Sequence, residues 1–279
     1  MCIRDSDGTE LLARVWKAEI RGVTGHTVPV FFLDTFHPEN SERHLNLGLT
    51  LYGGDDWVRI RQEYLLGVGG VRLLEQMGYD VDGLHLNEGH CTFALLEMLG
   101  KGWSREELAK RVLFTTHTPV PAGHDRFQWG DVEEVLGELM PKDAKQLVID
   151  AGDSENGERI SMSHLAVALS GPVNAVSNLN AWVASSMFAD HHIAPITNGV
   201  HHITWTSPAM SELFDTHLEG WKEDPTKLAH AGRIPTQDLA QSRDKARKVL
   251  RDLVKVGTGV DLESDRLTIG FARRFATYK

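Results

Sequence analysis

The stretch that decides the fold runs from residue 81 to residue 119 and reads VDGLHLNEGHCTFALLEMLGKGWSREELAKRVLFTTHTP. Residues 81–86 and 112–116 are short apolar runs typical of buried strands, and residues 91–99 between them have a helical pattern that ends at Gly100. Ser104 and Glu107 have the spacing of a capping box, which predicts the start of another helix. A strand, two helices and a second strand in this order indicate an α/β fold with a parallel sheet.

The same alternation continues on both sides of this stretch. Further strands are expected at residues 28–33, 173–177, 193–197 and 267–272. Further helices are expected at residues 57–74, 131–140, 163–169, 178–188, 208–218 and 236–254. Gly67, Gly69 and Gly70 interrupt the first of these helices at a cost of about 1 kcal/mol each relative to alanine. We expect that another backbone approaches closely at these glycines.

The composition excludes several classes of protein. The chain has 279 residues, of which 41% are hydrophobic and 24% charged, and its net charge is −10. A general nucleic-acid binder or a protein that binds anionic membranes needs a basic surface, so neither partner is expected. The two cysteines, Cys2 and Cys91, are too few for a disulfide framework and fit a reducing compartment.

Neither a signal peptide nor a membrane span is visible in the sequence, so we expect a cytoplasmic protein. Both ends of the chain have unusual sequences. Residues 1–6 (MCIRDS) precede no recognisable helix or strand pattern and resemble a cloning scar. Residues 270–279 (GFARRFATYK) place a cluster of cations directly after a strand-like run. We therefore expect a fragment of a longer protein that exposes apolar surface around residues 267–271 and tends to associate.

Polar residues follow directly after four of the expected strands. In parallel sheets, ligands bind beyond the carboxyl ends of the strands, so these residues are the candidates for a site. They are Asn87, Glu88 and His90 after the first strand, His117 after the second, Asn198 after a third, and Arg273, Arg274, Tyr278 and Lys279 after the last. Helix caps, turns and surface charges are the structural alternatives for the same residues. We expect His117, Asn198 and Arg274 to face one cleft, with Asn87 and Glu88 at the same side of the sheet.

Other kinds of site find no support in the residue spacing. The chain has 14 histidines, but no pair of them has the spacing of HExxH or of a zinc finger, so no metal site is expected. There is no Gly-x-Ser-x-Gly motif and no P-loop, and the glycines at residues 67–70 lie within a helix. Composition and spacing thus indicate an α/β ligand-binding enzyme with a polar rim and a cluster of cations.

Seven segments of the chain resemble the α-glucan (glycogen, starch, maltodextrin) phosphorylases, particularly the shorter bacterial branch. The segments occur in the order of that family and cover the chain from about residue 28 to its end. They are LYGGD at residues 51–55, RQEY at 61–64, HLNEGH at 85–90, THTP at 116–119, MSHL at 162–165, TNGV at 197–200 and RRFATYK at 273–279.

The resemblance implies a glycosyltransferase-B architecture, in which two doubly wound α/β domains enclose the active site. Residues 7–197 would be the later part of the first domain and residues 198–279 the truncated start of the second. The family holds pyridoxal 5′-phosphate as a Schiff base on a lysine in a Gly-rich motif. No lysine of this chain lies in such a motif, so we expect the lysine outside this fragment and the fragment itself to be inactive.

The family reaction is phosphorolysis, in which inorganic phosphate releases α-D-glucose 1-phosphate from the end of an α-1,4-glucan. By resemblance, Arg274 and Lys279 bind the substrate phosphate, and Arg273 and Tyr278 lie near the cofactor phosphate. Clustered cations suit this role because two phosphates in contact repel each other strongly.

The resemblance also implies residues that contact the sugar. His117 recognises the glucosyl unit at the bond that is cleaved, and Asn198 binds a glucose hydroxyl. Asp55 lies in a mobile loop that gates the cleft, whereas Asn87, Glu88 and His90 line the approach of the glucan. Residues 276–277 are Ala-Thr where larger phosphorylases have His-Glu, which affects subsite detail and regulation.

Two alternatives remain open at this stage. A nucleotide-sugar glucan synthase shares the fold and a cationic cluster, although His117 together with Tyr278 and Lys279 favours phosphorolysis. A glucan-binding fragment without catalytic activity is the other alternative. The sequence does not determine the glucan length, the regulation or the oligomeric state, and a homo-oligomer is possible.

Overall fold

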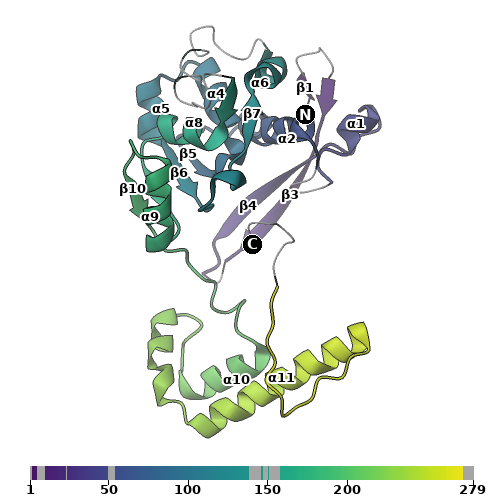
Figure 1. Ribbon diagram of the computed structural model, residues 1–279, viewed down its shortest axis with the longest axis vertical. Coiled ribbons are helices and arrows are strands. Elements are labelled where there is room, and N and C mark those ends of the chain that lie inside the picture. The colour runs from purple at the N-terminus through teal and green to yellow at the C-terminus, as the bar shows by residue number, and fades with distance from the viewer. Residues whose placement is uncertain are drawn as a thin grey trace. The chain divides into compact units, whose positions relative to one another are not determined.

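The computed structural model of the chain describes residues 2–4, 10–22, 24–49, 54–137, 146, 150 and 158–272. The chain divides into two compact units, Met1–Asn198 and Gly199–Lys279 (Figure 1). Whether these units are the partial domains that the resemblance implies, 7–197 and 198–279, stays a prediction.

The centre of unit 1 is a parallel four-stranded sheet. Its strands are β5 (Leu84–Asn87), β6 (Val112–Thr116), β9 (Val173–Ala175) and β10 (Ile193–Pro195), in the order β10-β9-β6-β5. All neighbouring pairs are parallel, so every strand ends at the same edge. The predicted α/β class with a parallel sheet is confirmed, whereas the glycosyltransferase-B arrangement stays a prediction.

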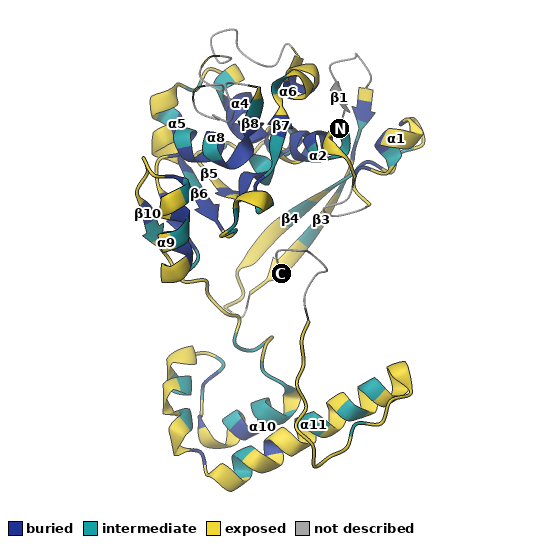
Figure 2. Cartoon of the chain, viewed as in Figure 1, coloured by how far each residue is buried: buried dark blue, intermediate teal, exposed yellow. Residues whose placement is uncertain are grey.

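Helices pack on this sheet and bury its apolar residues. They are α4 (Phe93–Gly100), α5 (Arg105–Arg111), α8 (Met162–Leu169) and α9 (Asn178–Met187). Helix α8 contacts β6 and α5, and α9 lies beside β9 and β10 (Figure 1). The predicted capping box is present, because Ser104 and Glu107 exchange both hydrogen bonds at the start of α5. The two central strands, β6 and β9, are largely dark blue in Figure 2, as expected of a core.

A long helical segment continues through all three of the glycines in its middle. It consists of α2 (Asp56–Tyr64), the π-helix η1 (Leu65–Gly69) and α3 (Gly70–Gln76). A Cβ atom on Gly67 would lie 2.6 Å from the backbone nitrogen of Ala94 in α4, so the expected close approach is confirmed there. A Cβ atom on Gly70 would meet nothing within 4 Å, so the same expectation is wrong for Gly70.

The run at residues 28–33 forms a strand, but it is not the buried strand that its composition predicted. It belongs to β4 (Thr27–Asp34), which pairs antiparallel with β3 (Arg14–Arg21) in a separate two-stranded ribbon. Val28 is 50% exposed and Phe32 is 54% exposed, because β4 pairs with no strand other than β3 among the described residues (Figure 2).

The remaining elements of unit 1 are short. They are β1 (Cys2–Arg4), β2 (Glu10–Leu12), α1 (Glu42–Leu45), η2 (Gly89–Cys91), η3 (Pro121–Gly123), β7 (Arg126–Gln128), α6 (Trp129–Leu136) and β8 (Arg159–Ser161). β7 and β8 pair antiparallel and bring the loop before β7 close to the start of α8.

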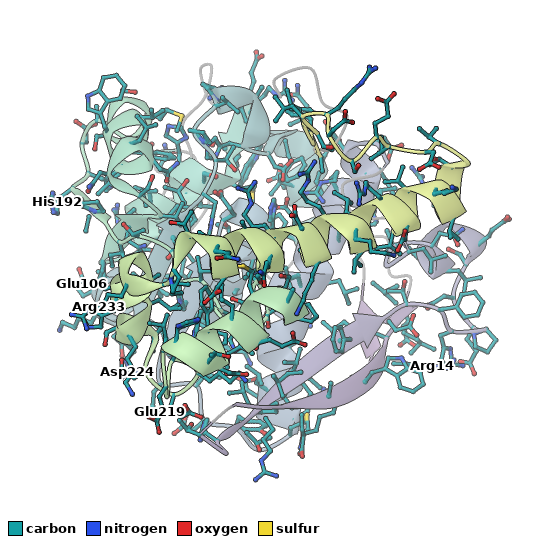
Figure 3. The ribbon with its side chains drawn as sticks, turned by 90° about the horizontal axis from the view of Figure 1, so that it is seen from below. Arg14, Glu106, His192, Glu219, Asp224 and Arg233 are labelled. Carbon is teal, nitrogen blue, oxygen red and sulfur yellow. The ribbon has the colours of Figure 1, made fainter. Side chains whose placement is uncertain are left out.

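Unit 2 is helical in its described part. It contains α10 (Pro208–His217), the 3₁₀ segment η5 (Pro225–Arg233) and the long α11 (Thr236–Thr258). Its small core is Trp221 with three apolar neighbours, Leu213, Leu218 and Ile234. Glu219, Asp224 and Arg233 are exposed on its outer surface (Figure 3).

The predicted strand at residues 267–272 is wrong. These residues are irregular, and Leu267, Ile269 and Phe271 are each more than 80% exposed. A buried strand needs a neighbouring strand to pair with, and the described residues of unit 2 contain none. The expected exposure of this apolar run is confirmed.

Among the described residues, no helix combines the length and apolar character that a membrane crossing requires.

Candidate active site

The carboxyl edge of the parallel sheet brings several of the predicted residues together. Asn87 is the last residue of β5, and Glu88 follows it. His117 follows the end of β6. The backbone N–H of Asn198 donates to the carbonyl of Val176, one residue beyond β9, at 3.1 Å. Asn87, Glu88, His117 and Asn198 thus lie at one edge of the sheet, whereas the cleft that His117, Asn198 and Arg274 were expected to share stays a prediction.

Glu88 faces the loop after β6 rather than the solvent. Its Oε1 atom accepts hydrogen bonds from the backbone N–H groups of His117 and Thr118, the latter at 2.8 Å, and from the Thr116 hydroxyl at 3.3 Å. The side chain is buried, at 8% exposure. The side chain makes no helix-cap hydrogen bond, and its Oε1 atom is occupied by three internal donors. The predicted contact of Glu88 with glucan stays a prediction.

The backbone of Glu88 has an unusual conformation. Its φ of 64° and ψ of −178° lie in a region that is essentially restricted to glycine. Among the described residues with a side chain, Glu88 is the one with a positive φ. Such strain costs on the order of 1–3 kcal/mol and persists where surrounding contacts enforce it. The hydrogen bonds of the Glu88 carboxylate are contacts of this kind, and they hold the backbone of Glu88 in its positive-φ conformation.

The side chains of His117, Asn87 and Asn198 are all exposed at this edge. They are available to a ligand, as expected of residues that bind a sugar. A polar row lies just below them in the sheet, which the sequence did not predict. Thr115 Oγ1 donates to Asn174 Oδ1 at 2.7 Å and lies 2.7 Å from His85 Nε2. The row links β5, β6 and β9 side by side.

His90 belongs to a second group of charged residues. Its Nδ1 atom lies 3.3 Å from Asp125 Oδ2 and 3.9 Å from Glu63 Oε1. Arg59 Nη2 lies 2.7 Å from Asp125 Oδ2, 3.2 Å from Glu63 Oε1 and 3.4 Å from His90 Nδ1. We call these four residues the Arg59 cluster. His90 therefore contacts protein charges, and its predicted contact with glucan stays a prediction.

The Arg59 cluster shifts the titration of its members. Burial raises the pKa of the Glu63 carboxyl to about 8, although the hydrogen bond with His90 opposes this shift. Hydrogen bonds with Asp125 and Glu63 raise the pKa of His90 to about 9. Burial alone would raise the pKa of Asp125, but His90, Glu63 and Arg59 hold it well below its usual range. Near pH 7 the cluster therefore contains a protonated Glu63 and one carboxylate, Asp125, which faces the two cations Arg59 and His90.

Three members of this cluster have the residue types of a metal site. Ligand atoms of Glu63, His90 and Asp125 all lie within 4.8 Å of one another. The guanidinium of Arg59 faces the same three atoms, so the position of a cation is already taken by an arginine nitrogen. A dication there would also be repelled by Arg59. The geometry favours an internal salt bridge.

A cavity of about 610 Å³ lies next to the cluster within unit 1. Its wall is mostly apolar, and Arg59, Glu63 and His90 form a polar part of it. The apolar part comes from β4, η1, α3, β5 and α4, including Phe31, Leu66, Val71, Leu84 and Ala94.

Asp55 has a structural contact in the described chain. Its side chain accepts the backbone N–H of Val58 at 3.0 Å and thereby caps α2. It also lies 3.6 Å from Arg43, in an exposed ion pair. Residues 50–53, which precede it, lie outside the described residues, so the gating role of this loop stays a prediction.

The predicted cationic cluster lies outside the described residues. This applies to Arg273, Arg274, Tyr278 and Lys279, and their assigned roles stay predictions.

Comparisons with known proteins agree with the resemblance. Over 90% of its length the chain is 34% identical to a maltodextrin phosphorylase of Thermococcus litoralis, of which it spans 34%. Over 98% of its length it is 30% identical to a glycogen phosphorylase of Mycobacterium tuberculosis, of which it spans 37%. The chain is homologous to α-glucan phosphorylases.

A glycogen phosphorylase of Aquifex aeolicus is 31% identical over 95% of the chain, which spans 43% of that protein. The chain thus spans between about a third and just over two fifths of the length of these phosphorylases. No family model matches it.

Sequence reasoning missed the most connected residues of the site. No sequence pattern around Asp125 indicates its role, because its partners Arg59 and Glu63 lie far from it along the chain. Glu63 lies in the segment RQEY that resembles phosphorylases, but the segment by itself assigns it no role. A charged residue within an otherwise buried helix face was the available signal for Glu63, since a buried carboxylate requires a partner.

Proposed function

We propose that the protein carrying this chain is an α-glucan phosphorylase. It uses inorganic phosphate to cleave the terminal α-1,4 bond of glycogen, starch or maltodextrin and releases α-D-glucose 1-phosphate. The observation that carries the proposal is His117, an exposed imidazole at the carboxyl edge of a parallel sheet in a chain homologous to phosphorylases. We also propose that the architecture is of the glycosyltransferase-B type.

The residues of the carboxyl edge would bind the sugar. His117 and Asn198 offer exposed donors and acceptors for glucose hydroxyls, both at the carboxyl edge of one sheet. Arg274 and Lys279 would bind the attacking phosphate, because a guanidinium gives a planar fork of donors and an ammonium a point charge. Developing positive charge on the glucosyl unit would be stabilised by the bound phosphate anion.

Pyridoxal 5′-phosphate would supply proton exchange through its phosphate group in this reaction. A Schiff-base lysine lies in an enclosed site, whereas every lysine among the described residues is exposed or half-buried. These lysines do not fit that role. Arg273 and Tyr278 would lie near the cofactor phosphate.

Steady-state kinetics on the natural protein test the proposal, with phosphate and maltodextrin varied separately. Wild-type protein should release glucose 1-phosphate. Arg274→Ala should lower kcat/KM for phosphate by about 100-fold, roughly 3 kcal/mol of transition-state stabilisation. Arg274→Lys should fail as well, because a point charge does not reproduce the fork.

The matched control is Lys110→Ala, at the exposed end of α5, which should leave both parameters unchanged. Arg274→Ala that damages only the affinity for glucan would contradict the phosphate assignment. Glucan elongation from a nucleotide sugar, without phosphorolysis, would favour a synthase instead.

A further inference from the structure

The backbone of His117 and Thr118 is held almost entirely by side chains. Both N–H groups donate to Glu88 Oε1. The carbonyl of Thr118 lies 3.0 Å from His124 Nε2, and the carbonyl of His117 accepts from Asn180 Nδ2 at 3.5 Å. All four polar backbone groups of this dipeptide therefore have a side-chain partner.

The three holding side chains come from separate parts of the chain. Glu88 follows β5, His124 precedes β7, and Asn180 lies in the first turn of α9. They are buried, with exposures of 8%, 9% and 6%, whereas His117 is exposed. We call Glu88, His124 and Asn180 the backbone clamp.

Each member of the clamp is itself fixed. His124 Nδ1 lies 2.7 Å from Ser163 Oγ, and because a carbonyl only accepts, Nε2 carries the hydrogen toward Thr118. Asn180 Oδ1 accepts the N–H of Val176 at 3.3 Å, which orients its amide. Glu88 is held in its glycine-like conformation next to the Thr116 hydroxyl.

An ordinary turn would satisfy these groups by backbone hydrogen bonds at less cost. Burying three polar side chains and straining Glu88 is costly for an exposed dipeptide. The arrangement matches the requirement of a binding residue whose backbone must not move when substrate arrives, since preorganisation lowers the cost of ordering it.

We infer that Glu88, His124 and Asn180 are positioning residues, which fix the backbone of His117 so that its imidazole meets the glucosyl unit in one orientation. The inference rests on the proposed function. It also reassigns Glu88, which acts through His117 and does not bind glucan itself.

The first test is hydrogen–deuterium exchange on the natural protein, in peptides that span residues 114–123. Glu88→Ala should speed exchange of the two amides after β6 at least tenfold, and Glu88→Gln should have a smaller effect because its oxygen still accepts. The matched control is Glu97→Gln, another buried glutamate, whose partners are Arg72 and Lys101. It should leave exchange in these peptides unchanged.

The second test is a double-mutant cycle on phosphorolysis. Glu88→Ala should lower kcat at least 30-fold, while KM for phosphate changes less than twofold. In a His117→Ala background the same substitution should lower kcat less than threefold, because the residue it positions is gone. Glu88→Gln should retain more kcat than Glu88→Ala, just as its amides should exchange more slowly than those of Glu88→Ala.

Unchanged exchange in Glu88→Ala overturns the clamp. Equal losses of kcat in the presence and absence of the His117 imidazole overturn its positioning role. A natural protein without phosphorolysis would refute the proposed function instead, and in that case the exchange comparison alone decides whether the clamp exists.

Discussion

Glu63 and Glu88 are both buried glutamates, but their partners differ in kind. Glu88 is satisfied by backbone N–H groups and a hydroxyl, all neutral donors. Glu63 faces a carboxylate, an arginine and a histidine, and its Oε2 atom has no hydrogen-bond partner among the described residues. The first arrangement fixes a backbone. The second sets which side chains are protonated, because the pKa of each group depends on the charges of the other groups in the cluster.

The largest expected effect concerns the cation at the centre of the Arg59 cluster. Arg59→Met should lower the free energy of unfolding by about 3 kcal/mol at pH 7, because it removes one of the two cations that face Asp125 and leaves the hydrogen-bond acceptors of Asp125 and Glu63 without their arginine donor. Urea denaturation followed by circular dichroism measures this. Arg43→Met, which removes an exposed ion pair with Asp55, should cost less than about 1 kcal/mol. Equal losses would show that burial does not matter at Glu63.

The next effect is a dependence of stability on pH. Unfolding lowers the pKa of Glu63 from about 8 to its usual 4.5 and that of His90 from about 9 to 6.5. The folded protein therefore binds more protons between these values, and its stability should fall as pH rises from 5 to 9. We expect a fall of several kcal/mol, measured by urea denaturation across this range.

Glu63→Gln separates the two contributions. Glutamine does not titrate, so the slope between pH 5 and 6.5 should vanish. The part due to His90 above pH 6.5 should persist in reduced form, because Asp125 still raises the pKa of His90. A slope that is unchanged in Glu63→Gln would mean that Glu63 is ionised in the folded protein at pH 7.

Packing around Glu63 is tested by two glycines in the segment that follows it. Gly67→Ala should cost about 2 kcal/mol, because its Cβ would meet the backbone of α4. Gly70→Ala has open space and should stabilise by about 0.5–1 kcal/mol through the lower entropy of the unfolded chain. Thermal denaturation of both variants measures the contrast. Loss of stability in both would show that the π-helix itself requires glycine.

The smallest effect concerns the strain at Glu88. Glu88→Ala and Glu88→Gly lose the same hydrogen bonds, but glycine accepts the left-handed backbone without strain. We expect the alanine variant to be less stable than the glycine variant by about 1 kcal/mol, in the same urea measurement. Equal stability would mean that the loop relaxes and that the carboxylate alone does not enforce the conformation.

Much of the fold could be predicted because its signals are local. The strands at β5, β6 and β9 are short apolar runs between helices with clear ends, and Ser104 with Glu107 is a complete capping signal within four residues. The run at residues 28–33 has the same composition as a buried strand. Only its partner distinguishes it, and the partner is an isolated hairpin strand.

The site could be predicted only in part, for a similar reason. The position after a parallel strand placed His117 and Glu88 at one edge, but it did not show which way the Glu88 carboxylate points. The direction of the carboxylate depends on the positive φ of Glu88. A positive φ cannot be predicted from the sequence at a residue other than glycine. Arg59 and Asp125 meet through tertiary packing alone.

The parallel sheet joins strands that lie far apart along the chain. β5 and β6 are separated by residues 88–111, but β6 meets β9 only after residues 117–172 have been passed. Longer loops lose more entropy on closure and slow the folding of parallel sheets. The β5–β6 pair should therefore form early, and the edge of β6 should stay open until β9 docks. During synthesis, this edge is the one at which aggregation with another nascent chain would begin.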